Sequence, residues 1–210
     1  MPAEILFVAN CTLMLAATTA AIWLRPWRRL SPGGPTRAWL PVCAIMPLLW
    51  SLDHLGATSV AQPVSCAALL VLLAGWPLTV LALLPVAGVT VLAGDLGWIE
   101  GLHRLVWLGL VPATIALAIG AGVRRWLPNH LFVYILGRGY FATLVASALA
   151  GSIAYALHPS MPDVPIDQVL VARLLVAFGE AFVTGMVIAG LVAMRPGMLA
   201  TYSDRLYLPP

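Results

Sequence analysis

Long apolar runs, separated by short polar connections that contain proline or glycine, set the pattern of this chain. Residues 67–74 and 106–119 are apolar at nearly every position. Strands of a membrane barrel would instead alternate apolar and polar residues. A helix satisfies its own backbone hydrogen bonds and can therefore cross hydrocarbon. The pattern predicts an all-α protein, a polytopic bundle of transmembrane helices.

The lengths of the apolar runs predict about seven spans in a single integral membrane domain, residues 1–210, because a span needs roughly 20 apolar residues. Residues 65–92 are too long for one untilted helix. Pro77, in the sequence Gly75-Trp76-Pro77, lacks a backbone donor and clashes with the preceding turn, so we predict two short helices here, followed by a turn at 94–101. The other predicted spans are 5–24, 38–52, 103–123, 131–157 and 166–194.

The composition excludes an ordinary soluble domain. Hydrophobic residues make up 61% of the chain, charged residues make up 9%, and the mean hydropathy is +0.97, whereas soluble domains are about a quarter charged. The lipid bilayer is therefore the expected surrounding. No folded basic domain is left over that could bind nucleic acid. The cysteines stand singly in apolar segments and are expected to be core residues.

Charged residues separate by side when the seven predicted spans alternate across the membrane. One side receives Arg25, Arg28, Arg29, Arg37, Arg124, Arg125, Arg195 and Arg205. The other side receives Asp53, Asp95, Glu100, Asp163 and Asp167. Arg104 is the exception on this second side. Short cytoplasmic loops are enriched in arginine, so we predict an outward amino terminus and an inward carboxyl terminus.

Three ionisable residues lie deep in predicted spans: Glu180, Arg173 and Arg138. A charge at mid-bilayer costs roughly 2.5–3.5 kcal/mol on insertion scales, so each residue needs a reason to be there. Glu180 is either a ligand, proton carrier or gate, or a hydrogen-bond partner that joins neighbouring helices. Arg173 lies two turns earlier on much the same face, so the two can meet only through extended side chains or third groups. Arg138 lies between two glycines and can snorkel inward.

The histidines are candidate metal ligands, since imidazole is a common ligand of transition metals. His54 and His103 map to outer ends of spans, with Asp53, Asp95 and Glu100 nearby in the topology. Together these side chains could offer nitrogen and oxygen ligands to a divalent cation. The alternative for each histidine is a water-facing side chain at the membrane interface. His158, in the loop after the sixth span, is a weaker candidate.

The chain carries none of the short motifs of ordinary hydrolases and ATPases. Walker A, GxSxG, HExxH and CxxCH are all missing. We therefore expect a protein that is not an enzyme and needs no cofactor beyond a transported metal. Proton chemistry by Glu180 with Arg173 is the one enzymatic alternative.

Several stretches resemble the cobalt/nickel-type substrate-binding membrane components of energy-coupling factor (ECF) transporters. The similarity runs from about residue 53 to the end, and the tail looks like that of a proteobacterial branch. The stretches are DHLGAT at 53–58, GWP at 75–77, GLH at 101–103, LPNHLFVY at 127–134, GEAFVTGM at 179–186 and ATYSDRLYL at 200–208. The resemblance implies a multi-pass protein of a bacterial inner membrane that captures Co²⁺ or Ni²⁺ from outside. It also implies a separate coupling subunit and ATPases as partners.

The family's metal ligands are matched only in part. In metal-binding members the ion is held by the amino-terminal amine, by a histidine at the second position and by a histidine in a motif similar to His54-Leu55-Gly56. His54 is therefore the first ligand candidate. The second position here is Pro2, which offers neither an imidazole nor a backbone N–H. His103 stands where the family tends to carry asparagine and is the second candidate.

Two functions follow from these patterns. The leading hypothesis is a substrate-capture subunit of a cobalt or nickel uptake system, with His54 and His103 as metal ligands. The rival is a noncatalytic membrane subunit or assembly factor of another complex that has lost the metal site, and Pro2 favours it. A transporter would bring a coupling subunit and ATPases from native membranes, whereas a structural subunit would bring a different complex.

Overall fold

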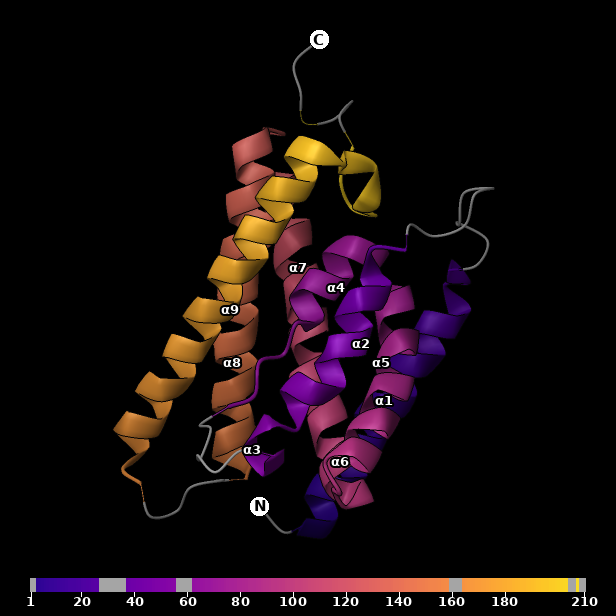
Figure 1. Ribbon diagram of the computed structural model, residues 1–210, viewed down its shortest axis with the longest axis vertical. Helices are drawn as coiled ribbons and strands as arrows, with labels where there is room; N and C mark the ends of the chain where they lie inside the picture. The colour runs from indigo at the N-terminus through magenta and orange to yellow at the C-terminus, as the bar shows by residue number, and fades with distance from the viewer. Residues whose placement is uncertain (1–2, 27–36, 56–61, 159–163, 204–206, 208–210) are drawn as a thin grey trace.

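The chain folds as a bundle of helices (Figure 1). The computed structural model describes residues 3–26, 37–55, 62–158, 164–203 and 207, and these residues contain no strand. The α-helices are α1 (Ala3–Trp23), α2 (Trp39–Trp50), α3 (Leu52–Leu55), α4 (Ala67–Ala74), α5 (Trp76–Ala93), α6 (Trp98–Arg104), α7 (Val111–Trp126), α8 (Ala142–Leu157) and α9 (Ile166–Met194). Two π-helical segments, η2 (Leu105–Leu110) and η3 (Val133–Phe141), and a 3₁₀ turn, η4 (Pro196–Met198), complete the described part. The predicted all-α class is confirmed.

Five helical stretches of the described residues are long and apolar enough to cross a membrane. They are Glu4–Trp23, Trp76–Ala93, Trp98–Trp126, Val133–Leu157 and Ile166–Met194. α2 has 12 residues and α4 has 8. At the helical rise these lengths correspond to about 18 Å and about 12 Å, against a hydrocarbon core of about 30 Å. Crossings by the segments that contain α2 and α4 therefore stay a prediction.

The predicted break at Gly75-Trp76-Pro77 is confirmed. α4 ends at Ala74, and Gly75 takes φ +79° and ψ 153° before α5 begins. A side chain at this backbone conformation would be strained, and Pro77 suits the first turn of the new helix. α4 begins in a similar way, because its N-cap residue Cys66 has φ 57°. The short helix is thus bounded at each end by a residue with a positive φ.

The predicted turn at 94–101 is too long. The chain turns at 94–97, and α6 begins at Trp98 with Gly97 extended before it. α6, η2 and α7 then continue as one helical stretch, so His103 lies inside a helix and not at its first residue. Glu100 and Arg104, four residues apart, pair across one turn of α6 and support its early start.

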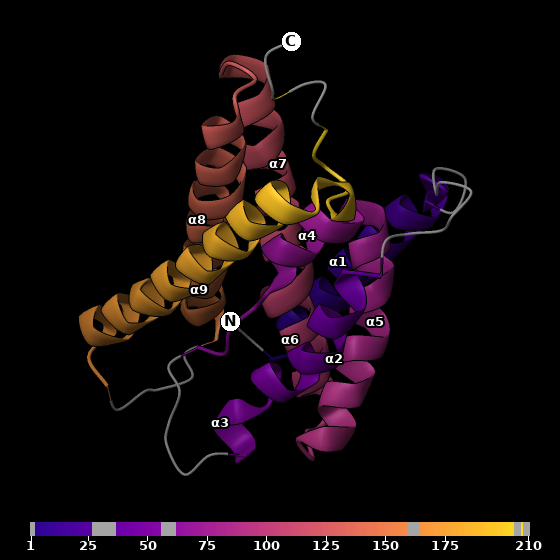
Figure 2. The same cartoon turned by 45° about the horizontal axis from the view of Figure 1, so that its top comes forward.

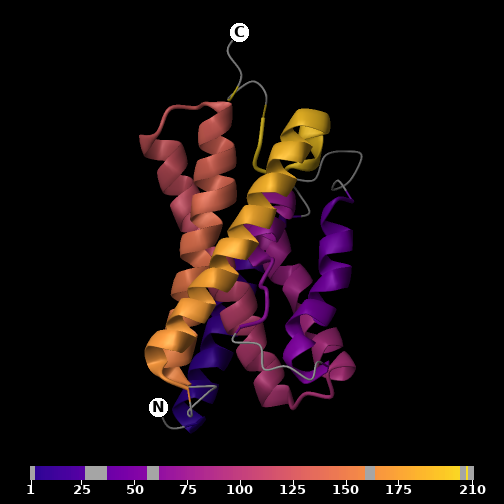
Figure 3. The same ribbon diagram turned by 60° about the vertical axis from the view of Figure 1, so that its left-hand side comes forward.

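The two ends of the bundle differ in charge (Figures 1 and 3). The end of the bundle that is uppermost in both views holds the last residues of α1, α7 and α9 and the first residues of α2. The opposite end holds α3 and the first residues of α1, α6 and α9. The upper end, here called the basic end, carries Arg25, Arg37, Arg124, Arg125 and Arg195. The lower end, here called the acidic end, carries Asp53, Asp95, Glu100 and Asp167. Arg28, Arg29, Asp163 and Arg205 fall outside the described residues, and the direction of the bundle in the membrane stays a prediction.

Small residues let α8 and the preceding η3 pack closely against their neighbours, and Ala146 of α8 shares a buried cluster with Ala68 of α4 and Ala116 of α7. Ala142, Ala146 and Ala150 on α8 are almost fully buried. A Cβ atom added to Gly139 of η3 would lie 3.5 Å from Ile188 of α9. Figure 2 shows α9 running diagonally across α8 toward α4, and α9 contacts both helices. This arrangement brings the deep residues of α9 to the start of α4.

Candidate functional site

The two predicted metal ligands have different surroundings. His54 lies on α3 with 48% of its side chain exposed, and its Nε2 is 3.9 Å from the carboxylate of Asp53. His103 lies on α6, is partly buried, and contacts Asn10, Trp107 and His158. In the described part of the chain, no three side chains of the His, Cys, Asp and Glu types are grouped so that they could hold a metal ion.

His103 is instead one of a pair of imidazoles at the acidic end. The ring centroids of His103 and His158 are 5.8 Å apart and the rings are tilted by 54°. Two imidazoles that share an ion each bring a nitrogen to about 2.0–2.1 Å from it, so the two rings must lie close together, as they do here. His158, the weaker candidate from sequence, therefore becomes the structural neighbour of His103.

Asn10 lies between Trp107 and the ring of His103. The Oδ1 atom of Asn10 accepts a hydrogen bond of 3.1 Å from the indole N–H of Trp107, and its Nδ2 atom lies 3.5 Å from Nδ1 of His103. Nδ2 can only donate, so this contact favours the tautomer of neutral His103 that accepts at Nδ1 and carries its proton on Nε2. A metal bound at Nε2 would move that proton to Nδ1 and require the Asn10 amide to turn.

The carboxylates expected beside the histidines are bound to Arg104. Its guanidinium, 5% exposed, donates to both carboxylate oxygens of Asp53 at 2.8 and 2.6 Å and to Glu100 at 2.8 Å. It also donates to the carbonyl oxygen of Trp50 at the end of α2. The one arginine that broke the predicted charge separation is thus neutralised locally. We refer to Asp53, Glu100 and Arg104 as the acidic-end lock.

The acidic-end lock shifts the titration of Asp53. Partial burial of this carboxyl tends to raise its pKa, but the hydrogen bonds and positive charge of Arg104 outweigh that effect, so the pKa lies below its usual value. Asp53 is therefore ionised and already paired. A cation that used it as a ligand would have to compete with Arg104.

Glu180 caps the start of α4. Its Oε1 accepts a hydrogen bond of 2.9 Å from the backbone N–H of Cys66. Its Oε2 accepts one of 3.2 Å from the N–H of Ser65 and one of 2.7 Å from the hydroxyl of Ser147. A carboxylate at the beginning of a helix satisfies free N–H groups and suits the helix dipole. Of the two readings of Glu180, this geometry matches the hydrogen-bond partner that joins neighbouring helices.

Arg173 binds the segment that leads into α4. Its Nη1 donates to the carbonyl of Gly151 at 2.7 Å and lies 3.4 Å from Oε1 of Gln62, and its guanidinium stacks 5.2 Å from the ring centroid of Tyr155. Glu180 holds residues 65–66 of the same segment. The third group that lies between Arg173 and Glu180 is therefore the stretch 62–66, which both side chains contact.

Arg138 points toward the carboxyl-terminal tail. Its Nη1 donates to the carbonyl of Thr201 at 3.2 Å, and its guanidinium lies 5.3 Å from the ring centroid of Tyr134. The same tail covers the end of α4: the N–H of Ala200 donates to Leu73 at 3.3 Å, and the hydroxyl of Thr201 donates to Leu72 at 3.2 Å. Both ends of α4 are thus held by residues from far along the chain.

Sequence reasoning missed several of these residues. Asn10 interrupts an apolar run and is 2% exposed, which is the kind of buried polar residue that needs a partner. The spacing of Glu100 and Arg104 was a second usable signal. The roles of Gln62, Ser147 and Thr201 depend on contacts between distant segments and had no signal along the chain.

Comparison with known proteins gives no assignment. No family model matches the chain, and neither the curated proteins nor the solved structures contain a match.

Proposed function

We propose that this chain is the substrate-capture subunit of an ECF-type uptake system for a divalent transition metal such as Co²⁺ or Ni²⁺. The observation that carries the proposal is the pair of imidazoles, His103 and His158, 5.8 Å apart at the acidic end. Imidazole nitrogen suits Co²⁺ and Ni²⁺. The resemblance of the sequence motifs to that transporter family supports the same reading.

In this proposal, the acidic end attracts the cation and the histidines hold it. Asp95 and Asp167 are exposed there and would raise the local concentration of cations. His103 and His158 supply two nitrogens, and His54, exposed on α3 at the same end, is the candidate for a third. Loading favours the neutral imidazoles, so the affinity should fall as the pH is lowered and the imidazoles become protonated.

Passage of the ion would depend on partner subunits. Within the described residues, Glu180, Arg104 and Arg138 bind groups of the protein itself. The sequence has no nucleotide-binding motif. A membrane coupling subunit and ATPases would therefore supply the energy.

The test is calorimetric titration of the purified full chain with Co²⁺ and with Ni²⁺. We expect His103→Ala and His158→Ala each to weaken binding by at least about tenfold, because loss of even an outer-shell partner of a metal ligand costs roughly 10- to 100-fold in affinity. His130→Ala is the matched control, because His130 is an exposed histidine between α7 and η3 at the basic end. Absence of heat with the unaltered chain, or equal loss in the control, would reject metal capture.

The rival function is a noncatalytic membrane subunit or assembly factor. The observation that favours it is the use of Glu180 and Arg104 in hydrogen bonds that join helices. Purification from native membranes separates the two functions. Recovery of a coupling subunit with ATPases supports the transporter, and recovery of another complex without bound metal supports the rival.

A further inference from the structure

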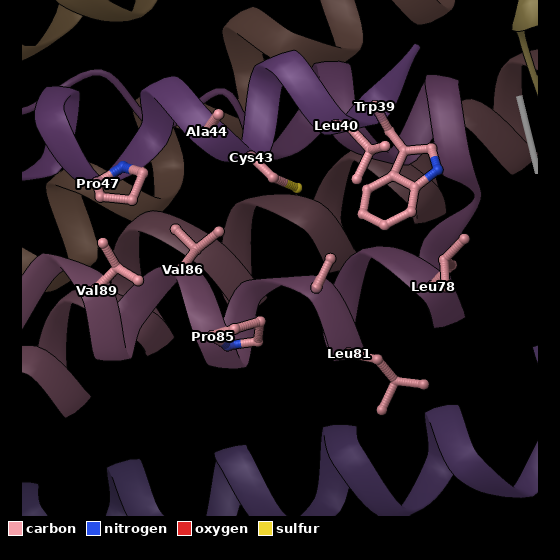
Figure 4. Close-up of a pocket in the computed structure, with 11 residues that line it drawn as sticks. Trp39, Leu40, Cys43, Ala44, Pro47, Leu78, Leu81, Pro85, Val86 and Val89 are labelled. Carbon is pink, nitrogen blue, oxygen red and sulfur yellow. The ribbon is translucent and has the colours of Figure 1, made fainter. Parts of the chain in front are cut away.

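An apolar groove lies between α2 and α5, away from the histidines. Figure 4 shows Trp39 and Leu78 at one end of this groove and Pro47 and Val89 at the other. The groove has a volume of about 600 Å³ and is open along one side. None of the described residues that line it is charged. An opening of this kind on a membrane protein faces hydrocarbon.

The length of the groove matches one leaflet of a bilayer. Trp39 to Pro47 on α2 spans about 12 Å, and Leu78 to Val89 on α5 spans about 17 Å, at 1.5 Å per residue. One leaflet contributes half of a hydrocarbon core of about 30 Å. A spanning helix of a partner would need a groove about twice as long. An acyl chain that enters from one surface needs only this length.

An exposed arginine precedes the residue at the mouth of the groove by two positions. The Trp39 end lies where α2 begins, at the basic end of the bundle. Arg37 is exposed, and its backbone carbonyl accepts a hydrogen bond from the N–H of Leu40 in the first turn of α2. A guanidinium beside an apolar groove can pair with a phosphate whose acyl chain occupies the groove. Anionic lipids are attracted to such positions.

We propose that this groove binds one acyl chain of an anionic phospholipid from the leaflet at the basic end, with the phosphate at Arg37. Cys43 and Ala44 form the middle of the wall on α2. Ala44 is exposed, so a larger side chain at this position fills the groove without entering the core.

The test is native mass spectrometry of the full chain released from nanodiscs that contain equal amounts of phosphatidylglycerol and phosphatidylcholine. We expect one retained phospholipid, with phosphatidylglycerol favoured about fivefold, the preference that one arginine near a membrane surface provides. Ala44→Phe should lose the retained lipid. Ala16→Phe, at an exposed alanine of α1, is the matched control and should keep it.

Two further variants keep the test decisive. Val89→Trp fills the groove from α5, where Val89 is 50% exposed, and replaces Ala44→Phe if that variant does not fold. Arg37→Gln should keep a lipid but lose the preference for phosphatidylglycerol. Arg195 is an exposed arginine at the same end, and Arg195→Gln should keep both the lipid and the preference. Lipid retention unchanged by both groove-filling variants would overturn the proposal. The proposal would also be overturned if a polypeptide, and not a lipid, copurified with the unaltered chain from native membranes and was lost in Ala44→Phe.

Discussion

At the scale of single residues, Arg104 is the side chain on which most of the acidic end depends. It is buried on α6, yet it reaches the end of α2, both oxygens of Asp53 on α3, and Glu100 one turn earlier. A buried cation is tolerated only while its partners remain charged and in place. The acidic-end lock therefore couples three helices through one guanidinium.

Replacing Asp53 by asparagine should destabilise the protein by about 3 kcal/mol, because the variant leaves a buried guanidinium with only part of its compensation. Reversible unfolding in mixed micelles measures this change. Asp95→Asn is the matched control, since Asp95 is exposed at the same end and its φ of 50° suits asparagine. Equal effects of the two substitutions would show that the lock contributes nothing.

Asp53 also makes the free energy of unfolding depend on pH. The pKa of Asp53 is lower in the folded protein than its ordinary value of about 4, so its contribution to the free energy of unfolding is complete above that value. The contribution is lost as the pH falls through the folded-state pKa. Unfolding of Asp53→Asn, followed over the same acidic range, should lack this component.

At the scale of secondary-structure elements, α4 is the segment that most needs outside support. It has eight residues, and its backbone ends would meet hydrocarbon or protein instead of water. Glu180 and Ser147 lie at its beginning, and the tail around Thr201 lies at its end. Hydrogen bonds to α9 and to the carboxyl-terminal tail therefore hold both ends of α4 in place.

Glu180→Ala should raise hydrogen exchange at the start of α4 and lower stability, because the N–H groups of Ser65 and Cys66 lose their acceptor at roughly 1–3 kcal/mol each. Glu180→Gln keeps one acceptor oxygen, so its hydrogen exchange and stability should lie between those of the unaltered chain and those of Glu180→Ala. Glu4→Ala, at an exposed glutamate in the first turn of α1, is the control. If Glu180→Ala left the exchange of α4 unchanged, the capping role would be wrong.

The sequence predicted the elements better than it predicted their connections. The apolar run of α9 and the break at Gly75 could be recognised, because lipid demands long apolar stretches and proline interrupts them. The early start of α6 was missed, since Trp98–Gly101 looks like a glycine-flanked turn. The joining of His103 to His158 and of Glu180 to Cys66 could not be predicted, because these contacts depend on how distant helices cross.

At the scale of the whole molecule, the separation of charge gives the bundle a direction. Arginines gather at the basic end and carboxylates at the acidic end, and the positive-inside rule predicts that the basic end faces the cytoplasm. This direction would expose the paired histidines to the outside, as capture of an external ion requires.

The direction is tested by labelling intact cells with a maleimide that does not cross membranes. Asp95→Cys should react and Arg124→Cys should not, because these exposed residues lie at opposite ends. The unaltered chain supplies the baseline for Cys11, Cys43 and Cys66, which are partly buried. Reaction of Arg124→Cys alone would reverse the predicted topology, and the proposed outward-facing metal capture would be wrong.

The support of α4 by late parts of the chain has a consequence for biogenesis. A ribosome delivers α4 long before it synthesises Glu180 and Thr201. Until those residues emerge, the N–H groups of Ser65 and Cys66 and the carbonyls of Leu72 and Leu73 lack the partners that they have in the folded protein. The nascent chain must therefore keep this stretch near the bilayer surface or in the translocation channel, and can bury it only when the last helix arrives.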